Sequence, residues 1–425
     1  MQAPLFPTSR LEIAGIGVRE LAGKFGTPTF VYDAAKIVER LGDLAAFDYV
    51  RYAQKACSNL AIVDLVRRHG GLVDTVSSGE IQRALAAGYT ADGVPPPLVY
   101  TADIFDRETL DLCVNKNIHV NCGSPDMLDQ LGARAPGREI TLRINPGFGH
   151  GHSQKTNTGG KHAKHGIWHE QIVDCLRRAD RGALKVTGLH MHIGSGADLE
   201  HLAQVCGAME QMAYQVGSTI TAISAGGGLP VPYREEQSYV DLAAYFALWD
   251  AARKRLEDRF QHAVRLEIEP GRYLVAESGY LIAEIRAVKR QAENVFYLLD
   301  AGFNNLARPI LYGAYHPMSI VPADGQTSRP EHNVIVGGPL CESGDIFTQE
   351  EGGFVAPRRL PEARVGDLLV IECAGAYGFV MGSNYNSQPL AAEVLIDAGH
   401  PRLIRRRQTF DDLVRGETIP GRPQS

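Results

Sequence analysis

The sequence predicts a closed parallel α/β barrel followed by a β-rich domain. Eight short apolar runs, each followed by a segment of helical periodicity, lie between about residues 48 and 269. Eight such alternations favour a closed barrel of about 250 residues over an open doubly wound sheet. The remainder of the 425 residues leaves room for a second unit of about 100 to 150 residues.

The barrel strands are expected at the apolar runs, and the helices at the periodic segments between them. The expected strands are Asp48–Gln54, Leu72–Val76, Pro97–Thr101, Ile118–Asn121, Glu139–Asn145, Lys185–His192, Thr221–Ala225 and Arg265–Glu269. The expected helices include Glu80–Ala87, Glu108–Asn115, Glu170–Arg178, Leu199–Val216 and Val240–Arg259.

Past about residue 280 the pattern changes to β runs that Pro, Gly and other turn residues separate. These runs are Glu284–Val288, Val295–Leu299, Asn333–Val336, Asp367–Glu372 and Glu393–Ile396. We therefore predict three parts: residues 1–35, whose strand Thr27–Tyr32 joins the β domain; a (β/α)8 barrel over 36–282; and a β-sandwich or β-barrel domain over 283–425.

Composition predicts the class of protein. Hydrophobic residues make up 44% and charged residues 22%, as in soluble globular proteins. The net charge of −6 gives no overall attraction to nucleic acid or an anionic membrane, and we expect neither partner. The first ten residues lack a secretion signal, so a cytoplasmic protein is expected. The seven cysteines are scattered without a Cys-x-x-Cys pair, which argues against a disulfide framework.

Chemically capable side chains follow the expected strands at their carboxyl ends, where barrel enzymes carry their active sites. Lys55 ends the first strand and is expected to head into the barrel interior, where a desolvated amine can attack a carbonyl carbon. The alternative is a lysine that extends to the solvent at the rim.

A glycine triplet and a carboxylate follow strands seven and eight. Gly226–Gly228 would let backbone N–H groups approach a phosphate, although tight turns use glycine as well. Glu269 ends an apolar strand, and a buried carboxylate there needs a cationic partner. A pyridinium nitrogen would serve, as would an ion pair with Arg272 or Arg143.

His190 and His192 allow a second hypothesis, a metal-dependent barrel hydrolase with these two rings and an acidic residue as ligands. The loop before the sixth strand adds five histidines, at positions 150, 152, 162, 165 and 169. Their spacing is irregular, and a hydrolase would leave Lys55 and the glycine triplet without a role. We expect no metal site and assign the histidine-rich loop no role.

Seven motifs resemble the fold-type III pyridoxal-phosphate decarboxylases, and among them the members that decarboxylate meso-diaminopimelate to L-lysine in the last step of lysine biosynthesis. The resemblance covers almost the whole chain. The motifs are Tyr-Ala-Gln-Lys-Ala-Cys-Ser-Asn around Lys55, His-Met-His-Ile-Gly-Ser-Gly at 190–196, the triplet 226–228, Glu-Pro-Gly-Arg at 269–272, the run 308–312, Cys-Glu-Ser-Gly-Asp at 341–345 and Gly-Ala-Tyr-Gly at 375–378.

The resemblance implies a role for each matching residue at the cofactor, pyridoxal 5'-phosphate. Lys55 would bind it covalently, His192 would stack on its ring, and Glu269 would keep its ring nitrogen protonated. The other implied cofactor contacts are Asp74, Ser195, Gly227, Gly228, Pro270, Gly271, Arg272 and Tyr377.

The resemblance also implies how the substrate is held. Arg308, Tyr312 and Arg272, with Tyr377 nearby, would take the distal carboxylate, and Glu342 and Ser343 the distal ammonium. Cys341 would be the proton donor, within a homodimer in which residues 341–343 reach the partner subunit's Lys55. The alternative within the fold is another basic amino-acid or polyamine-precursor decarboxylase, whose substrate needs only acidic partners at its distal end.

Overall fold

The computed structural model describes residues 6–149, 159–192 and 198–421, and the chain divides into two compact units. The barrel unit contains Lys36–Pro232 and Ser238–Val275. The β unit contains Ala3–Ala35, Tyr233–Gln237 and Ala276–Ser425.

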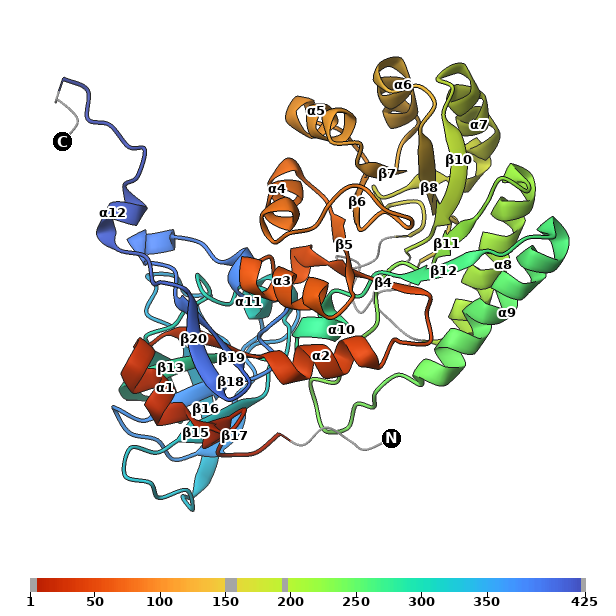
Figure 1. Ribbon diagram of the computed structural model, residues 1–425. Helices are drawn as coiled ribbons and strands as arrows, with labels where there is room; N and C mark the ends of the chain where they lie inside the picture. The colour runs from red at the N-terminus through yellow and green to blue at the C-terminus, as the bar shows by residue number, and fades with distance from the viewer. Residues whose placement is uncertain (1–5, 150–158, 193–197, 422–425) are drawn as a thin grey trace. The chain divides into compact units, whose positions relative to one another are not determined.

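Eight parallel strands form a closed ring in the barrel unit, which confirms the predicted barrel (Figure 1). The ring closes because β12 pairs with β4 and β10 pairs with β8. In ring order the strands are β4 (Tyr49–Ala53), β5 (Leu72–Thr75), β6 (Leu98–Ala102), β7 (His119–Cys122), β8 (Glu139–Asn145), β10 (Lys185–His190), β11 (Ala222–Ser224) and β12 (Arg265–Ile268); the short β9 (Ile167–Trp168) pairs with β8.

Helices cover the outer side of the strand ring (Figure 1). Side chains of Asn, Ser or Asp cap the N-termini of several of them, as at Asn59, Ser77 and Asp106. The helices are α2 (Ala34–Gly42), α3 (Leu60–Arg68), α4 (Ser78–Ala86), α5 (Arg107–Asn115), α6 (Pro125–Arg134), α7 (Ile172–Arg181), α8 (Leu199–Val216), α9 (Leu242–Phe260) and α10 (Arg272–Val275).

A buried ion pair lies where the ring closes. Arg51 on β4 donates from Nε to Oε2 of Glu267 on β12 at 2.5 Å, and from Nη2 to Oε1 at 3.2 Å. Both residues are buried, so the two-point geometry satisfies charges that would otherwise be costly to desolvate. The pair joins the first and last strands of the ring and so fixes their register.

The β unit is built on one long sheet whose order is β17-β16-β14-β13-β3-β19-β20, with β18 paired to β13 and β15 paired to β18. Its strands are β1 (Glu12–Ile13), β2 (Ile16–Gly17), β3 (Thr29–Asp33), β13 (Gly279–Gln291), β14 (Asn294–Leu299), β15 (Met318–Val321), β16 (Glu331–Gly337), β17 (Arg358–Pro361), β18 (Leu368–Ile371), β19 (Ala392–Asp397) and β20 (His400–Arg405). The helices are α1 (Val18–Phe25), α11 (Arg308–Tyr312) and α12 (Phe410–Leu413).

The N-terminal strand lies inside this sheet, as predicted. β3 pairs antiparallel with β13 and parallel with β19, and three of its five residues are wholly buried aromatic or aliphatic side chains. Val31 of β3 packs in an apolar cluster with Leu21, Ile282, Val370 and Val394. The cluster draws on five distant parts of the chain and forms a core of the β unit.

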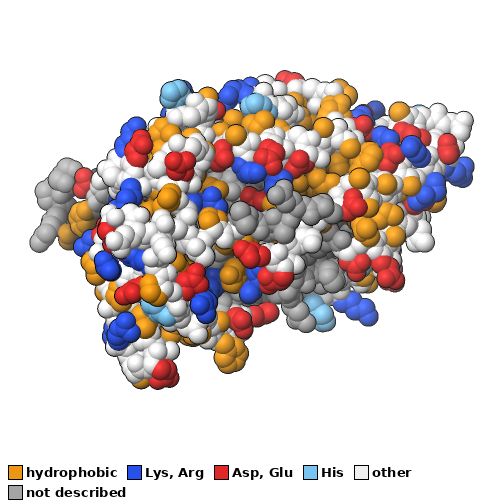
Figure 2. All heavy atoms as spheres, turned by 90° about the horizontal axis from the view of Figure 1, so that it is seen from below, with side chains coloured by type: hydrophobic (Ala, Val, Ile, Leu, Met, Phe, Trp, Pro, Cys, Tyr) orange, Lys and Arg blue, Asp and Glu red, His pale blue; other side chains and the backbone are white. Residues whose placement is uncertain are grey.

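Basic and acidic side chains are interspersed over the face seen in Figure 2. In the part of the chain that the structure describes, no helix combines the length and the apolar character that a membrane crossing requires.

Candidate active site

Lys55 lies at the carboxyl end of the first barrel strand, in a single 3-10 turn (Gln54–Ala56) that follows β4. Of the two alternatives for its side chain, the structure favours the one at the rim, because Lys55 is exposed. The reason is that the strand ends two residues earlier, at Ala53, and the turn carries the lysine onto the rim. An amine on the rim is accessible to a ligand.

Two buried carboxyl groups lie within the ring, and their surroundings push their pKa values apart. Burial, and then the negative charge of Glu269, raise the pKa of Asp74 well above its usual value, while Lys55 opposes that shift. For Glu269 the same burial is outweighed by His190, Arg51 and Arg143, so its pKa is lowered. Glu269 is therefore the more acidic of the two, and the surroundings of Asp74 disfavour its charged form.

His190 is the partner of Glu269. Its Nε2 lies 2.6 Å from Oε2 of the carboxylate, and both side chains are buried. The hydroxyl of Ser224 donates to the other oxygen, Oε1, over a longer 3.3 Å. Oε2 is thus held firmly, and Oε1 keeps most of its capacity to accept a hydrogen bond.

His192 lies near Lys55 with its ring fixed by the glycine triplet. Its Nδ1 accepts a hydrogen bond from the backbone N–H of Gly227 at 3.2 Å, so that nitrogen carries no proton. Burial, and then the positive charges of Lys55 and Arg143, lower the pKa of His192 well below its usual value. The ring is neutral at physiological pH and presents a flat aromatic surface.

The glycine triplet is tightly packed and admits no side chain. A Cβ on Gly226 would approach the carbonyl oxygen of Met191 to 2.5 Å, and one on Gly227 would approach that of Glu269 to 2.5 Å. Gly226 and Gly228 also have positive φ angles of 63° and 99°, which favour glycine. The triplet thus brings bare backbone to the rim beside His192 and Glu269.

The Glu-Pro-Gly-Arg motif continues the rim after β12. The carbonyl oxygen of Pro270 accepts a hydrogen bond from the N–H of Ala53 at 3.1 Å, which ties the motif to the end of β4. Gly271 packs closely on Ala53, and Arg272 begins α10. Ser195, another predicted cofactor contact, lies outside the described residues, as do His150 and His152.

His165, a described residue of the histidine-rich loop, belongs to a local contact. Its Nδ1 lies 2.7 Å from Oδ2 of Asp103, and the N–H of Gly166 donates to Oδ1 of the same carboxylate at 2.7 Å. Among residues 6–149, 159–192 and 198–421, no group of three or more His, Cys, Asp or Glu side chains could hold a metal ion.

In the β unit, Arg308 is buried at the start of α11, and Tyr312 ends the same helix. Nη1 of Arg308 donates to Nε2 of His316 at 2.9 Å and to the hydroxyl of Tyr233 at 3.1 Å. Nδ1 of His316 in turn donates to the carbonyl oxygen of Glu372 at 3.0 Å, which fixes its tautomer. Arg308 is therefore held in one orientation by a buried chain of hydrogen bonds.

Cys341, Glu342 and Ser343 lie exposed in a turn of the β unit. Asp345 organises this turn: its carboxylate accepts from the N–H groups of Leu340 at 2.8 Å and Phe303 at 2.7 Å. Tyr377 stands apart from these in a left-handed conformation, with φ of 57°. Three consecutive residues of this turn thus expose a thiol, a carboxylate and a hydroxyl group.

The structure thus brings together the predicted residues of the barrel unit: Lys55, Asp74, His192, Gly227, Gly228, Glu269, Pro270, Gly271 and Arg272. Sequence reasoning did not assign roles to His190, Ser224, Tyr233 or His316. His190 sits in a recognised motif, and its alternation with His192 was a usable signal. Nothing local marks His316.

A barrel with an accessible lysine, a buried anionic carboxylate and a bare-backbone triplet on one rim is typical of enzymes that bind pyridoxal phosphate. A family model for the "Pyridoxal-dependent decarboxylase, pyridoxal binding domain" matches residues 35–276, more than half of the chain.

Full-length relatives narrow this class. The diaminopimelate decarboxylase of Escherichia coli (strain K12) is 52% identical over 421 residues, which cover 99% of this chain and 100% of that protein. A crystal structure of a diaminopimelate decarboxylase is 53% identical with a TM-score of 0.91, over 93% of this chain and 94% of that chain. The Helicobacter pylori enzyme complexed with L-lysine is 31% identical with a TM-score of 0.82, over 93% and 98% of the two chains. This chain belongs to the diaminopimelate decarboxylase family.

Proposed function

We propose that this chain decarboxylates meso-2,6-diaminopimelate to L-lysine and carbon dioxide, with pyridoxal 5'-phosphate as cofactor. The observation that carries the proposal is the 52% identity with a diaminopimelate decarboxylase along both units. The reaction makes the chain a carboxy-lyase of lysine biosynthesis.

The barrel rim fits the cofactor. When bound, pyridoxal phosphate supplies the electron sink that stabilises the negative charge left as carbon dioxide departs. Lys55 would hold it covalently, and neutral His192 would lie flat on its ring. Oε1 of Glu269 is the carboxylate oxygen left for the ring nitrogen, and the orphaned Oδ1 of Asp74 fits a further polar contact.

The phosphate would be held by Ser195, Gly227, Gly228, Gly271, Arg272 and Tyr377. Backbone N–H groups can approach an anion closely at the triplet because no side chain intervenes.

Residues of the β unit would hold and protonate the substrate. The guanidinium of Arg308, oriented by His316 and Tyr233, presents the planar fork that matches a carboxylate, and Tyr312 and Arg272 would take part in holding the same group. Glu342 and Ser343 would take the distal ammonium. The exposed thiol of Cys341 would deliver the proton to the carbon that loses carbon dioxide.

The proposal includes a homodimer with shared sites, in which Cys341, Glu342 and Ser343 serve the partner subunit's Lys55. Their exposure on a rigid turn supports this arrangement. We also place the enzyme in the cytoplasm, because all seven cysteines are free thiols, as in proteins of a reducing compartment. Neither a nucleic acid nor a membrane is part of the proposed function.

The test is incubation of the purified holoenzyme with meso-diaminopimelate while L-lysine and carbon dioxide are measured. We expect both products in equal amounts, with little turnover of L-ornithine or L-lysine. Preferential turnover of ornithine would favour the alternative decarboxylase and contradict the substrate assignment.

The covalent link can be checked separately from turnover. Borohydride reduction of the holoenzyme followed by peptide mapping should place the pyridoxyl group on Lys55. A group on another lysine would contradict the assignment of the rim.

A further inference from the structure

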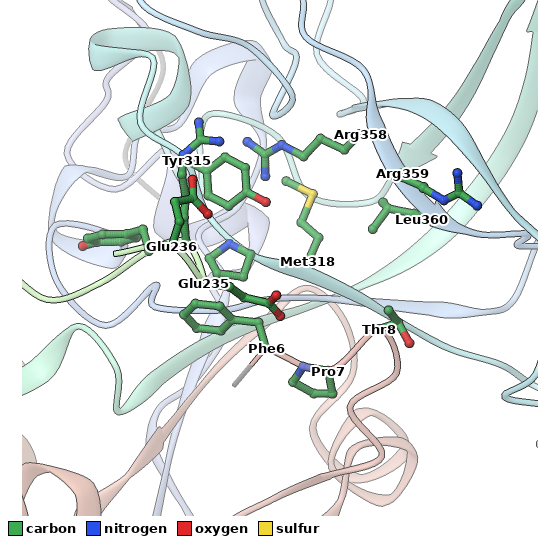
Figure 3. A pocket seen from close by; sticks show the side chains of 13 residues that line it. Phe6, Pro7, Thr8, Glu235, Glu236, Tyr315, Met318, Arg358, Arg359 and Leu360 are labelled. Atoms are coloured by element: carbon green, nitrogen blue, oxygen red, sulfur yellow. The ribbon is translucent and has the colours of Figure 1, made fainter. Parts of the chain in front are cut away.

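The β unit contains a cavity of about 370 Å³ that the proposed reaction does not use. Cavities of about 300 to 1,000 Å³ are the usual size for small-molecule ligands. Figure 3 shows the side chains of Glu235, Tyr315, Met318, Arg358 and Phe6 around it. The lining combines charges of both signs with apolar side chains.

Tyr315 lies between two arginines. The guanidinium carbon of Arg234 is 3.9 Å from the centre of its ring, and that of Arg358 is 3.8 Å from it. Two guanidinium groups this close cannot share one face of a ring without overlapping, so they occupy opposite faces. Stacking on an aromatic ring stabilises each cation but leaves the N–H edges able to donate.

Arg359 of the lining pairs with Glu331 at 3.0 Å, whereas four other charged side chains of the cavity have no ion-pair partner among the described residues. Among the described residues, neither Arg234 nor Arg358 has a carboxylate within 4 Å, and neither does Glu235 or Glu236 have a cation. Burial, and to a lesser extent the positive charge of Arg234, lower the pKa of Arg358 to about 10. Arg358 stays cationic at neutral pH, in surroundings that a bound anion would improve.

We propose that this cavity binds a free amino acid, with its carboxylate at the N–H edges of Arg234 and Arg358 beside the Tyr315 ring and its ammonium at Glu235 or Glu236. Guanidinium groups bind carboxylates through paired hydrogen bonds, and a carboxylate is the complementary partner of an ammonium. Phe6, Met318 and Leu360 supply an apolar surface for an aliphatic side chain. The mixture of charges favours a zwitterion over a simple anion such as phosphate.

One residue of the cavity lining, Tyr233, also contacts Arg308. Tyr233, which lines the cavity, hydrogen bonds with Arg308 through its hydroxyl at 3.1 Å. A ligand that moves Tyr233 would therefore change how Arg308 is held. This link to the reaction rests on the proposed role of Arg308, whereas binding in the cavity does not.

The test counts binding sites for L-lysine on the holoenzyme by equilibrium dialysis. The wild type should bind two molecules per chain, one at the active site and one in the cavity. Arg234→Gln/Arg358→Gln should bind one. Arg286→Gln, an exposed arginine of the same unit paired with Glu284, is the matched control and should bind two.

Further variants and probes separate the possible failures. Glu235→Gln/Glu236→Gln changes only exposed side chains and should weaken the cavity site about tenfold, the effect of losing a charge-assisted hydrogen bond. Cadaverine, which lacks the carboxylate, should bind there at least tenfold more weakly than L-lysine. Arg308→Lys should weaken the other site more than the cavity site, which it reaches only through the hydrogen bond with Tyr233.

The cavity site is overturned if the double arginine variant, shown to be folded by circular dichroism, binds as many L-lysine molecules as the wild type. If the wild type binds one L-lysine molecule and that variant binds none, the single binding site is the cavity. The expected binding of L-lysine at the active site is then contradicted.

Discussion

At the residue scale, two buried carboxyl groups of the barrel, Asp74 and Glu269, differ because of their neighbours rather than their chemistry. The pKa of Glu269 is lowered because His190 and two arginines outweigh its burial, whereas for Asp74 burial and the charge of Glu269 outweigh Lys55 and a hydrogen bond from Thr101. The position of Glu269 was predictable from its strand end. The alternation of His190 with His192 was a usable signal for the histidine, but not for its pairing with Glu269, since the two lie 79 positions apart in the chain.

Glu269→Gln tests the role of the negative charge on the Glu269 carboxylate. The amide keeps the shape of the side chain but removes the anion that would hold the ring nitrogen protonated. We expect the variant to retain pyridoxal phosphate and to lose about 10- to 100-fold in kcat, the effect of about 1.5 to 3 kcal/mol. Glu170→Gln, an exposed residue of the same unit, serves as control in the same assay. A variant as fast as the wild type would refute the role of Glu269.

Arg308→Lys tests whether the planar guanidinium group of Arg308 binds the distal carboxylate of the substrate. Lysine keeps the charge but cannot donate two parallel hydrogen bonds or reach both His316 and Tyr233. We expect KM for diaminopimelate to rise about tenfold or more, with a parallel weakening of product inhibition by L-lysine. Arg286→Lys should change neither constant. Unchanged constants for Arg308→Lys would move the distal carboxylate elsewhere.

His119 links stability to pH. Burial, and then the positive charges of Arg51, Arg138 and Arg265, lower its pKa to about 3. The unfolded chain, with a pKa of about 6.5, binds the proton first, so this histidine costs stability as pH falls below about 6.5. Between pH 7 and pH 5, wild type should lose up to about 2 kcal/mol more of unfolding free energy than His119→Gln. Parallel losses in urea titrations would contradict the assignment.

At the element scale, the barrel strands were predictable because each strand is buried between two neighbouring strands and a covering helix. Such a strand consists of a short apolar run that is visible in the sequence. The sequence left open whether Lys55 lies in the interior or at the rim, because no sequence signal marks the 3-10 turn that follows β4 after Ala53. In the β unit, β13 begins at Gly279, before the expected Glu284, because its first half pairs with β3 and β18. Such pairings join distant segments and leave no periodic signal.

Gly227→Ala tests the bare backbone of the segment that follows β11. The new Cβ would meet the carbonyl oxygen of Glu269 at 2.5 Å, so the backbone must shift. We expect about 1 to 3 kcal/mol of lost stability in calorimetry and a lower content of bound pyridoxal phosphate by absorbance. Gly207→Ala, in α8 with no atom within 4 Å of its added Cβ, should be neutral or stabilising. Equal behaviour of the two variants would mean that the rim tolerates a side chain there.

At the scale of the whole molecule, the candidate residues are divided between two units, with the cofactor set mostly in the barrel and the substrate set mostly in the β unit. Tyr377 of the β unit and Arg272 of the barrel unit are the exceptions. The division was predictable from the change of pattern near residue 280. The sequence does not tell whether the β unit completes the site of its own barrel or that of the partner subunit. Both arrangements are made from the same sequence.

Mixing two inactive variants answers that question. Lys55→Ala and Cys341→Ala each remove one half of the proposed site, and a heterodimer of the two would contain one intact site. We expect activity to recover toward about a quarter of the wild-type level after subunit exchange, by analogy with other shared isologous interfaces. No recovery despite proven exchange would mean that both residues act within one chain.

The place of β3 in the sheet has a consequence for synthesis on the ribosome. Thr29–Asp33 is translated before the barrel, yet its neighbours, β13 and β19, are translated after it. The nascent chain therefore carries an apolar strand with both edges unpaired while some 250 residues of barrel emerge, and its second edge is covered only when residues 392–397 appear. A chain interrupted before that point keeps an open sheet edge, which makes the last thirty or so residues important for solubility during expression as well as for the finished fold.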